Sequence, residues 1–338
     1  MQSGIATAAD RRRRRGIATE GAGRVRETGA VMPLRQAWEL ALYGPDGFDT
    51  RHAPSDHFRT SSTASPRFAG AIADLAAACD LDTVIDLAAG GGELATGLES
   101  IRPDLTLVAI DRRPRPERLP DRIEWRSELP DRIDGLVVAN EWLDNVPCTV
   151  AEVDEDGRLR EVLVDPATGR ETLGDDVAGP DLEWARRWWL VSDPGHRVEI
   201  GRARDVAWRD VVRRLDRGLA VAIDYGHVGS ARPEYGSLRS YRGGRAVDVA
   251  YDGSRDVTAD VALDAVAAAG GSRLLRQREA LRSLGVHGTR PDLASARDDP
   301  AGYVRALSDA GAAAELTASP GLGDFGWIVT AVGVPAPW

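Results

Sequence analysis

The sequence contains no lysine, so all 43 of its basic residues are arginine, and asparagine occurs only at positions 140 and 145. This usage indicates a coding bias that has removed Asn and Lys wherever Arg, Asp or Gly can serve. Both asparagines lie in one hexapeptide, Asn140-Glu141-Trp142-Leu143-Asp144-Asn145. We therefore expect this segment to carry side chains that cannot be exchanged freely.

Other absences exclude whole classes of protein. No apolar run approaches the roughly 18 residues that a membrane-spanning helix requires. The net charge of −10 argues against a nucleic-acid-binding protein, which usually presents a basic face. Cys79 and Cys148 are the only cysteines and lack metal-site spacing, so they predict a reduced, cytoplasmic protein with neither a disulfide nor a metal site. An acidic surface would attract a basic peptide.

The first residues differ from the rest of the chain. They are rich in arginine and contain no apolar segment of the kind found in secretory signals. Their acidic residues and scarcity of serine argue against a mitochondrial transit peptide. We interpret residues 1–32 as a disordered basic tail, or as the result of an upstream start codon with Met32 as the working start.

The pattern of apolar residues predicts an α/β fold with a seven-stranded, Rossmann-like sheet. Short runs rich in β-branched residues alternate with helical patterns, which is typical of βαβ units and a parallel sheet. The predicted strands cover residues 83–87, 105–111, 122–125, 134–139, 218–224, 272–277 and 325–332. The predicted helices cover residues 33–43, 66–79, 93–100, 206–215, 261–269, 279–284 and 301–315.

The pattern changes within residues 148–200, which we interpret as an insertion subdomain. Strands over 149–153 and 159–164 flank Asp156-Gly157, a hairpin signal. Tryptophans at positions 184, 188 and 189 share a predicted helix, where core packing is their expected role. The remaining domain predictions are a helical segment over the ligand site (33–80), the two halves of the core (81–147 and 201–338) and an acceptor-pocket loop (225–260).

A glycine-rich loop follows the first predicted strand. Asp86-Leu87-Ala88-Ala89-Gly90-Gly91-Gly92 fits D-x-A-x-G-x-G, and its glycines allow the backbone to approach a ligand closely. The loop lacks the G-x-G-x-x-G of dinucleotide sites, and Glu93 at the helix start would repel a pyrophosphate. A ligand with an ammonium or sulfonium centre fits better.

Asp111 ends the next strand, where an acidic residue accepts hydrogen bonds from both ribose hydroxyls. A strand, a glycine loop, a helix, a second strand and an acid form the arrangement that binds S-adenosylmethionine (SAM) in class I methyltransferases. Trp125 is either an adenine contact or a buried structural residue. The predicted cofactor-binding residues are Thr60, Ser61, Asp86, Ala88, Gly90, Gly92, Asp111, Trp125 and Asn140.

The residues after the fourth strand would face the transferable methyl group. Glu141 and Asp144 are three residues apart, so a helical turn would place both carboxylates on one side. Two carboxylates can hold a guanidinium by charge-assisted hydrogen bonds, and positioning would then supply most of the catalysis. The alternative is that Asp144 or Asn145 caps a helix and only Glu141 contacts the substrate.

At this hexapeptide the chain resembles the MidA-type SAM-dependent methyltransferases, whose motif is Asn-Glu-x-x-Asp-Ala-x-Pro. Further stretches resemble that family between residues 34 and 332: 41–45, 57–61, 223–226, 236–241 and 256–261. Mitochondrial members are complex I assembly factors that symmetrically dimethylate an arginine of a complex I subunit. The resemblance implies catalytic roles for Glu141, Asp144, Asp224 and Tyr225, and acceptor contacts for Trp142, Arg239 and Tyr241.

The chain departs from the family pattern at three points. Ala88 replaces the first glycine of the cofactor loop, Asp260 replaces a histidine, and no histidine follows Tyr241. The last two changes would lie over the acceptor, so the resemblance supports SAM more firmly than the acceptor. Glu141-Trp142 also resembles the Ser-Glu-Trp of protein arginine methyltransferases, whose second loop glutamate would have to be replaced by Asp144 or Glu152.

These observations predict a cytoplasmic enzyme that transfers a methyl group from SAM to an arginine nitrogen of a protein, with a complex I subunit as the candidate acceptor. Neither a nucleic acid nor a membrane is expected as a partner. One alternative is a methyltransferase that acts on a small molecule or another side chain. The other is a non-catalytic SAM-binding assembly factor whose tryptophan-bearing insertion is the partner surface.

Overall fold

The computed structural model describes residues 30–51, 61 and 65–338, so most of the basic tail and the predicted cofactor residue Thr60 lie outside the described residues. The strands are β1 (Met32–Pro33), β2 (Thr83–Leu87), β3 (Thr106–Ile110), β4 (Glu124–Arg126), β5 (Ile133–Asn140), β6 (Thr149–Val153), β7 (Leu159–Asp165), β8 (Arg170–Asp176), β9 (Arg197–Ile200), β10 (Leu215–Asp224), β11 (Gly226–His227), β12 (Arg239–Arg242), β13 (Arg245–Val247), β14 (Asp256–Thr258), β15 (Val261–Ala262), β16 (Arg273–Arg276) and β17 (Gly326–Val332). The α-helices are α2 (Leu34–Tyr43), α3 (Phe48–Arg51), α5 (Pro66–Ala78), α6 (Glu93–Ile101), α7 (Gly179–Trp188), α8 (Arg202–Arg213), α9 (Leu263–Gly270), α10 (Gln277–Ser283), α11 (Ser295–Asp298) and α12 (Pro300–Leu316), and the 3₁₀ turns are η2 (Leu143–Asn145), η3 (Gly229–Ala231) and η4 (Leu322–Asp324).

The central sheet has the strand order β16-β17-β10-β5-β2-β3-β4. Strands β2, β3, β4, β5 and β10 are mutually parallel where they pair, while β17 runs antiparallel to both β10 and β16. All seven strands expected from the sequence contribute to this sheet, so the predicted α/β fold class is confirmed. The carboxyl ends of β2, β3, β5 and β10 consequently meet along one edge.

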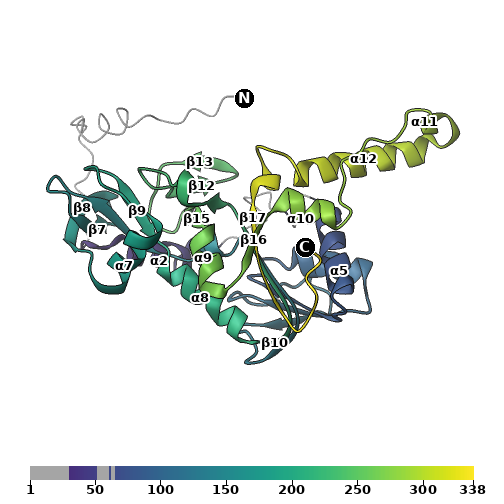
Figure 1. Ribbon diagram of the computed structural model, residues 1–338, viewed down its shortest axis with the longest axis horizontal. Helices are drawn as coiled ribbons and strands as arrows, with labels where there is room; N and C mark the ends of the chain where they lie inside the picture. Colours follow the sequence, from purple (N-terminus) through teal and green to yellow (C-terminus); the bar gives the residue numbers. More distant parts are fainter. Residues whose placement is uncertain (1–29, 52–60, 62–64) are drawn as a thin grey trace.

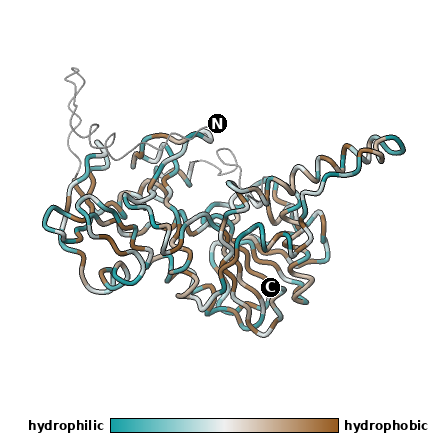
Figure 2. The backbone as a smooth tube through the Cα atoms, turned by 45° about the horizontal axis from the view of Figure 1, so that its top comes forward, coloured by the Kyte–Doolittle hydropathy of each residue, from teal (hydrophilic) through white to brown (hydrophobic). Residues whose placement is uncertain are grey.

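Both faces of the central sheet are buried along its inner strands, which are almost continuously apolar, whereas the edge strands β4 and β16 are partly exposed. Alternate residues of β5 point in opposite directions, as the two-residue period of a strand requires. Leu136 and Val138 pack in the core that includes α5 and α6, whereas Val137 and Ala139 pack with α8 and α9. Burying a Val or Leu side chain stabilises the fold by about 1.5–3 kcal/mol. The apolar strands appear as the brown interior of Figure 2.

The insertion contains a second, antiparallel sheet with the order β1-β7-β6-β9, and β8 pairs with β7. The predicted hairpin is confirmed, since β6 and β7 pair antiparallel on either side of the Asp156-Gly157 turn. The core role expected for the tryptophans is confirmed for Trp184 and Trp189, which are 6% and 1% exposed. Trp189 follows α7 rather than lying within it.

The N-terminal helical segment divides between the two sheets. Helix α2 presents apolar residues three and four apart, among them Leu34 and Trp38, and packs on the insertion sheet. Trp38 is fully buried, and its Nε1 donates a 2.7 Å hydrogen bond to the carbonyl of Val257. Helix α5, by contrast, packs on the central sheet. The insertion therefore folds around residues that precede it by more than a hundred positions.

Several short strands have no counterpart in the sequence-based prediction. Strand β8 is largely exposed and polar, and β12, β13 and β14 form a small separate sheet beside the site. Such strands lack the apolar alternation that identifies a strand in sequence. Helix α12 extends away from the body (Figure 1), and its buried residues, Ala310, Ala313 and Leu316, lie in its second half.

Three structural observations concern the membrane, disulfide and metal predictions that were made from the sequence. No helix in the described part of the chain is both long and apolar enough to cross a membrane. Cys79 and Cys148 are free, and each is buried in a different hydrophobic cluster. Within the described ranges, no group of three or more His, Cys, Asp or Glu side chains is arranged to hold a metal ion.

Candidate active site

The glycine-rich loop turns sharply between β2 and α6. Ala88, Gly90 and Gly92 have φ values of +59°, +63° and +80°, which is the left-handed region that glycine tolerates best. Ala88 accepts this conformation although it carries a Cβ, so the loop is strained at the residue that replaces the first family glycine. Gly92 caps α6, and a Cβ at that position would lie 2.4 Å from Cδ1 of Leu119.

We expect Gly92→Ala to lower the free energy of unfolding by about 2–4 kcal/mol, because a left-handed Ala is strained and its methyl group collides with Leu119. Gly157→Ala is the matched control: its φ is +76°, but no atom lies within 4 Å of the new Cβ. It should therefore lose only the backbone cost of about 1 kcal/mol. Urea unfolding of both variants measures the difference, and equal losses would contradict the role given to Leu119.

Asp111 connects the loop to the next strand. It is 8% exposed, and its Oδ2 accepts a 2.9 Å hydrogen bond from the backbone N–H of Gly90. Nε of Arg113 lies 3.0 Å from Oδ1, and Nη2 lies 3.0 Å from Oδ2. Arg113 also approaches Asp49, at 3.8 Å. Ribose hydroxyls that bind Asp111 would therefore compete with the guanidinium of Arg113.

Two cavities, of about 570 and 480 Å³, meet at Asp111. Their shared wall consists of Tyr43, Asp49, Ala88, Asp111 and Trp142. The larger cavity continues past Arg112 and Ser127, beyond the ends of β3 and β4. The smaller cavity, called here the acidic cavity, is lined by Leu42, Tyr43, Phe48, Asp49, Ala88, Ala89, Gly90, Glu93, Asp111, Arg113, Asn140, Glu141, Trp142, Asp144, Asn145, Tyr225, Arg239, Tyr241, Asp256 and Phe325. An elongated ligand with a ribose at Asp111 would extend into both.

Glu141 leaves the end of β5 with a left-handed backbone, at φ +52°. Its N–H donates a 2.7 Å hydrogen bond to the carbonyl of Ile223, and its Oε1 accepts hydrogen bonds of 3.2 Å from the Ser61 N–H and the Asn140 Nδ2. Burial, and secondarily the charge of Asp144, raise the pKa of Glu141 to about 8. This carboxyl group is poised to exchange a proton near neutral pH.

The expected helical turn through Glu141 and Asp144 is wrong. The 3₁₀ turn η2 begins only at Leu143, because Glu141 has the left-handed conformation and is bonded to the neighbouring strand instead. The two carboxylates nevertheless line the same acidic cavity. Their proximity arises from the shape of the loop rather than from helical spacing.

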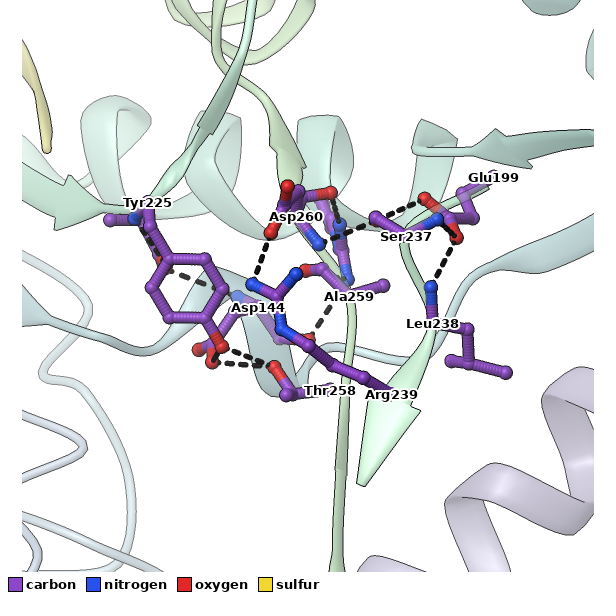
Figure 3. A network of polar contacts seen from close by, with 11 residues as sticks. Asp144, Glu199, Tyr225, Ser237, Leu238, Arg239, Thr258, Ala259 and Asp260 are labelled. Carbon is purple, nitrogen blue, oxygen red and sulfur yellow. Dashed lines mark hydrogen bonds and ion pairs between the residues drawn. The ribbon is translucent and has the colours of Figure 1, made fainter. Parts of the chain in front are cut away.

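Asp144 is 4% exposed and is held by two hydroxyl groups (Figure 3). Its Oδ2 accepts hydrogen bonds from the Tyr225 hydroxyl and, at 2.7 Å, from Oγ1 of Thr258. Its Oδ1 has no hydrogen-bond partner among the described residues. The fully buried Asp224 accepts the Asp144 N–H at 3.1 Å, and burial raises the pKa of Asp224 well above its usual range. Asp224 thus shapes the turn but lines neither of the two cavities.

Asp256 is a cavity residue that was not among the predicted site residues. Nδ2 of Asn145 donates hydrogen bonds to its Oδ1, at 3.1 Å, and to the carbonyl of Val257, at 3.3 Å. Burial and the charge of Asp144 raise the pKa of Asp256 to about 7. Residues 256–261 form one of the stretches that resemble the family, and this resemblance was the sequence signal that could have identified Asp256 as a site residue. Asn145 therefore joins the loop to β14 rather than capping a helix.

The structure brings most predicted site residues together, but not all of them. Ala88, Gly90, Asp111, Asn140, Glu141, Trp142, Asp144, Tyr225, Arg239 and Tyr241 line the acidic cavity. Asp86, Gly92, Trp125, Asp224 and Ser61 are not part of either cavity wall. Residues of this group can still support those that line the cavities, as the hydrogen bonds of Asp224 and Ser61 with the 141–144 segment illustrate.

Two of these residues, Asp86 and Trp125, and also Glu152 have clear structural partners. Asp86 accepts the N–H of Ala95 at 3.3 Å and so fixes α6, while Trp125 packs on the core and donates to the carbonyl of Arg113 at 3.0 Å. The structural alternative for Trp125 is thereby favoured. Glu152 pairs with Arg197 at 2.8 Å within the insertion sheet and lines neither of the two cavities, so it does not partner Glu141.

The comparisons with known proteins agree with this site. Residues 83–278 match a family model described as "Putative S-adenosyl-L-methionine-dependent methyltransferase". A Burkholderia thailandensis protein described as a "likely methyl transferase", with bound S-adenosyl-homocysteine, is 27% identical, with a TM-score of 0.74 and coverage of 90% of this chain and 89% of that one. A second structure from that organism, described as uncharacterized, is 26% identical, with a TM-score of 0.72 and coverage of 90% and 88%. No curated protein matches the chain.

The family match spans more than half of the chain and includes the glycine loop, Asp111 and the Asn140–Asn145 segment. The bound product in the Burkholderia protein is the molecule that SAM becomes after losing its methyl group. Both the family resemblance and the cofactor prediction are therefore confirmed. The chain belongs to the MidA-type family of SAM-dependent methyltransferases.

Proposed function

We propose that the enzyme methylates an arginine nitrogen of a protein, and that a respiratory complex I subunit is the first acceptor to examine. The observation that carries this proposal is the convergence of Glu141, Asp144 and Asp256 on the acidic cavity. The charge of Asp144 contributes to the raised pKa of both other carboxyl groups. Three acids of this kind, two buried and one half-buried, favour a cationic ligand, which would compensate their mutual repulsion.

A guanidinium group matches the cavity better than an ammonium group. It is planar and permanently charged, and it stacks on aromatic faces while donating hydrogen bonds in its own plane. Trp142, Tyr225 and Phe325 supply aromatic rings to the same wall. An internal example is Arg239, whose Cζ lies 5.0 Å from the centroid of the Tyr225 ring.

The chemistry then assigns different tasks to two carboxylates. The acceptor nitrogen forms a bond to the methyl carbon as the carbon–sulfur bond of SAM breaks, which leaves S-adenosyl-homocysteine and a nitrogen with one proton too many. Asp144, which lines the acidic cavity and whose Oδ1 is buried without a hydrogen-bond partner among the described residues, would hold the guanidinium, and Glu141, with its pKa near 8, would receive the proton. Alignment of the nitrogen with the methyl group supplies the remaining acceleration.

Radiolabelled SAM, incubated with the purified enzyme and a lysate of cells that lack it, tests the proposal. We expect protein-bound label that yields methylarginine on hydrolysis, and mass spectrometry should find the same arginine unmethylated in the deletion cells. The Glu141→Gln enzyme serves as the control, because protein-bound label that appears with this variant does not come from the proposed reaction. Label confined to small molecules would favour the small-molecule alternative. SAM binding without labelling of any fraction would favour the assembly-factor alternative.

A further inference from the structure

The acidic cavity contains a resident cation, Arg239, close to the acid proposed to hold the acceptor. Arg239 begins β12, and its guanidinium lies over the ring of Tyr225, with Cζ 5.0 Å from the ring centroid. The hydroxyl of that same tyrosine donates a hydrogen bond to Oδ2 of Asp144. Arg239 and Asp144 therefore contact the same aromatic side chain, one at its face and the other at its hydroxyl (Figure 3).

These two opposite charges are not paired with each other. Nη2 of Arg239 forms an ion pair with Oδ1 of Asp260 instead. Within the described part of the chain, Nε of Arg239 and Oδ1 of Asp144 are both buried without a hydrogen-bond partner. Leaving a buried donor and a buried acceptor unsatisfied is costly. Some other contact must therefore hold Arg239 in its present orientation.

Asp260 is itself fixed from several directions. Its N–H donates to Oγ of Ser237 at 2.8 Å, and Nη1 of Arg204 donates to its carbonyl at 2.9 Å. The buried Glu199 accepts the Oγ–H of Ser237 at 2.6 Å and the N–H of Leu238 at 2.8 Å. Figure 3 shows this chain of contacts, which joins the segment that carries Arg239 to the segment that carries Asp260.

We propose that Asp260 is a positioning residue that holds Arg239 against Tyr225 and thereby keeps Asp144 available to a cationic acceptor. The inference rests on the proposed function in so far as that function requires a cation at Asp144. Without the charge of Asp260, the flexible Arg239 side chain would be free to turn to Asp144, whose Oδ1 has no hydrogen-bond partner among the described residues. The enzyme's own guanidinium would then occupy the acceptor position.

Binding of agmatine, a small molecule that carries a guanidinium group, tests this role without requiring the natural acceptor. Calorimetric titrations would use full-length enzyme saturated with S-adenosyl-homocysteine. We expect Asp260→Asn to weaken agmatine binding at least tenfold, and Arg239→Gln, which removes the competing cation from the cavity, to strengthen it. The double variant should bind within about threefold of Arg239→Gln, because the competing guanidinium is gone.

Asp264→Asn is the matched control. Asp264 forms an ion pair with Arg232, and its side chain is 28% exposed, against 27% for Asp260, but neither Asp264 nor Arg232 lines the acidic cavity or the larger cavity beside it. Its agmatine affinity should equal that of the wild type. The affinity of each variant for S-adenosyl-homocysteine, expected within twofold of the wild type, verifies that the variant folds.

Three results would overturn the proposal. They are wild-type enzyme that does not bind agmatine, Asp260→Asn enzyme that binds it normally, and a double variant as weak as Asp260→Asn. The last result would mean that Asp260 only supports the local structure, which removal of Arg239 does not repair. If the agmatine results hold but no protein arginine is methylated, the arginine acceptor alone is rejected.

Discussion

Replacement of Glu141 by Gln is expected to lower the rate of methyl transfer at least a hundredfold, while the affinity for SAM changes less than threefold. Gln keeps the size of the side chain and can still accept hydrogen bonds from the Ser61 N–H and Asn140. It cannot receive a proton from the acceptor nitrogen, and general-base assistance contributes about 10²–10⁴-fold to an enzymatic rate. The loss should therefore appear in kcat rather than in cofactor binding.

Single-turnover transfer from labelled SAM, together with calorimetry of SAM binding, separates the two quantities. The wild-type rate should also rise with pH and level off above about 8, because burial raises the pKa of Glu141 to that value and only the carboxylate accepts a proton. Glu124→Gln, at an exposed position of β4, is the matched control and should transfer normally. Unchanged transfer by Glu141→Gln would reject Glu141 as the catalytic base.

Asp111→Asn is expected to weaken SAM binding by about 10–100-fold, since each charge-assisted hydrogen bond contributes about 1.5–3 kcal/mol. The carboxylate lies beside the backbone N–H of Gly90 and is the group placed to accept the ribose hydroxyls. An amide retains one acceptor oxygen but loses the charge and one acceptor site. The amide at position 111 would also release Arg113. This release would offset part of the loss of SAM affinity, because the guanidinium of Arg113 would no longer compete with the ribose.

Calorimetric titration with SAM and with S-adenosyl-homocysteine measures this effect. Both ligands carry the same ribose, so both should lose affinity by the same factor. Asp104→Asn is the control, because Asp104 lies just before β3 with its side chain 64% exposed. Equal affinities of Asp111→Asn and wild-type enzyme would show that the ribose lies elsewhere.

Much of the central fold could be predicted from the sequence because its signals are local. The β2 strand, predicted over 83–87, has those bounds in the structure. The β6–β7 hairpin also formed as predicted. Apolar periodicity and turn residues are properties of adjacent positions, so they survive without knowledge of the rest of the molecule. The glycine loop and the spacing of Asp111 predicted the cofactor, and the family resemblance added the catalytic roles of Asp224 and Tyr225 and the arginine acceptor.

The site residues that escaped prediction are those whose role depends on distant partners. Asp256 has no local pattern that distinguishes it from any other acid in a loop, and it becomes part of the site only when β14 reaches η2. Thr258 bonds to Asp144 across 114 residues of sequence. The left-handed Glu141 is similarly fixed by a hydrogen bond to Ile223, which belongs to the neighbouring strand.

The sequence by itself determined the seven strands of the central sheet, the glycine loop and the acids at the strand ends, because each follows from short-range spacing of apolar, small and charged residues. Only the tertiary structure decided which acids face one cavity, why Asp144 keeps an unpaired oxygen, and why Arg239 bonds to Asp260 instead. These outcomes depend on how the loops after β5 and β10 meet β12 and β14. That meeting is governed by packing between segments far apart in the chain, which no local pattern encodes.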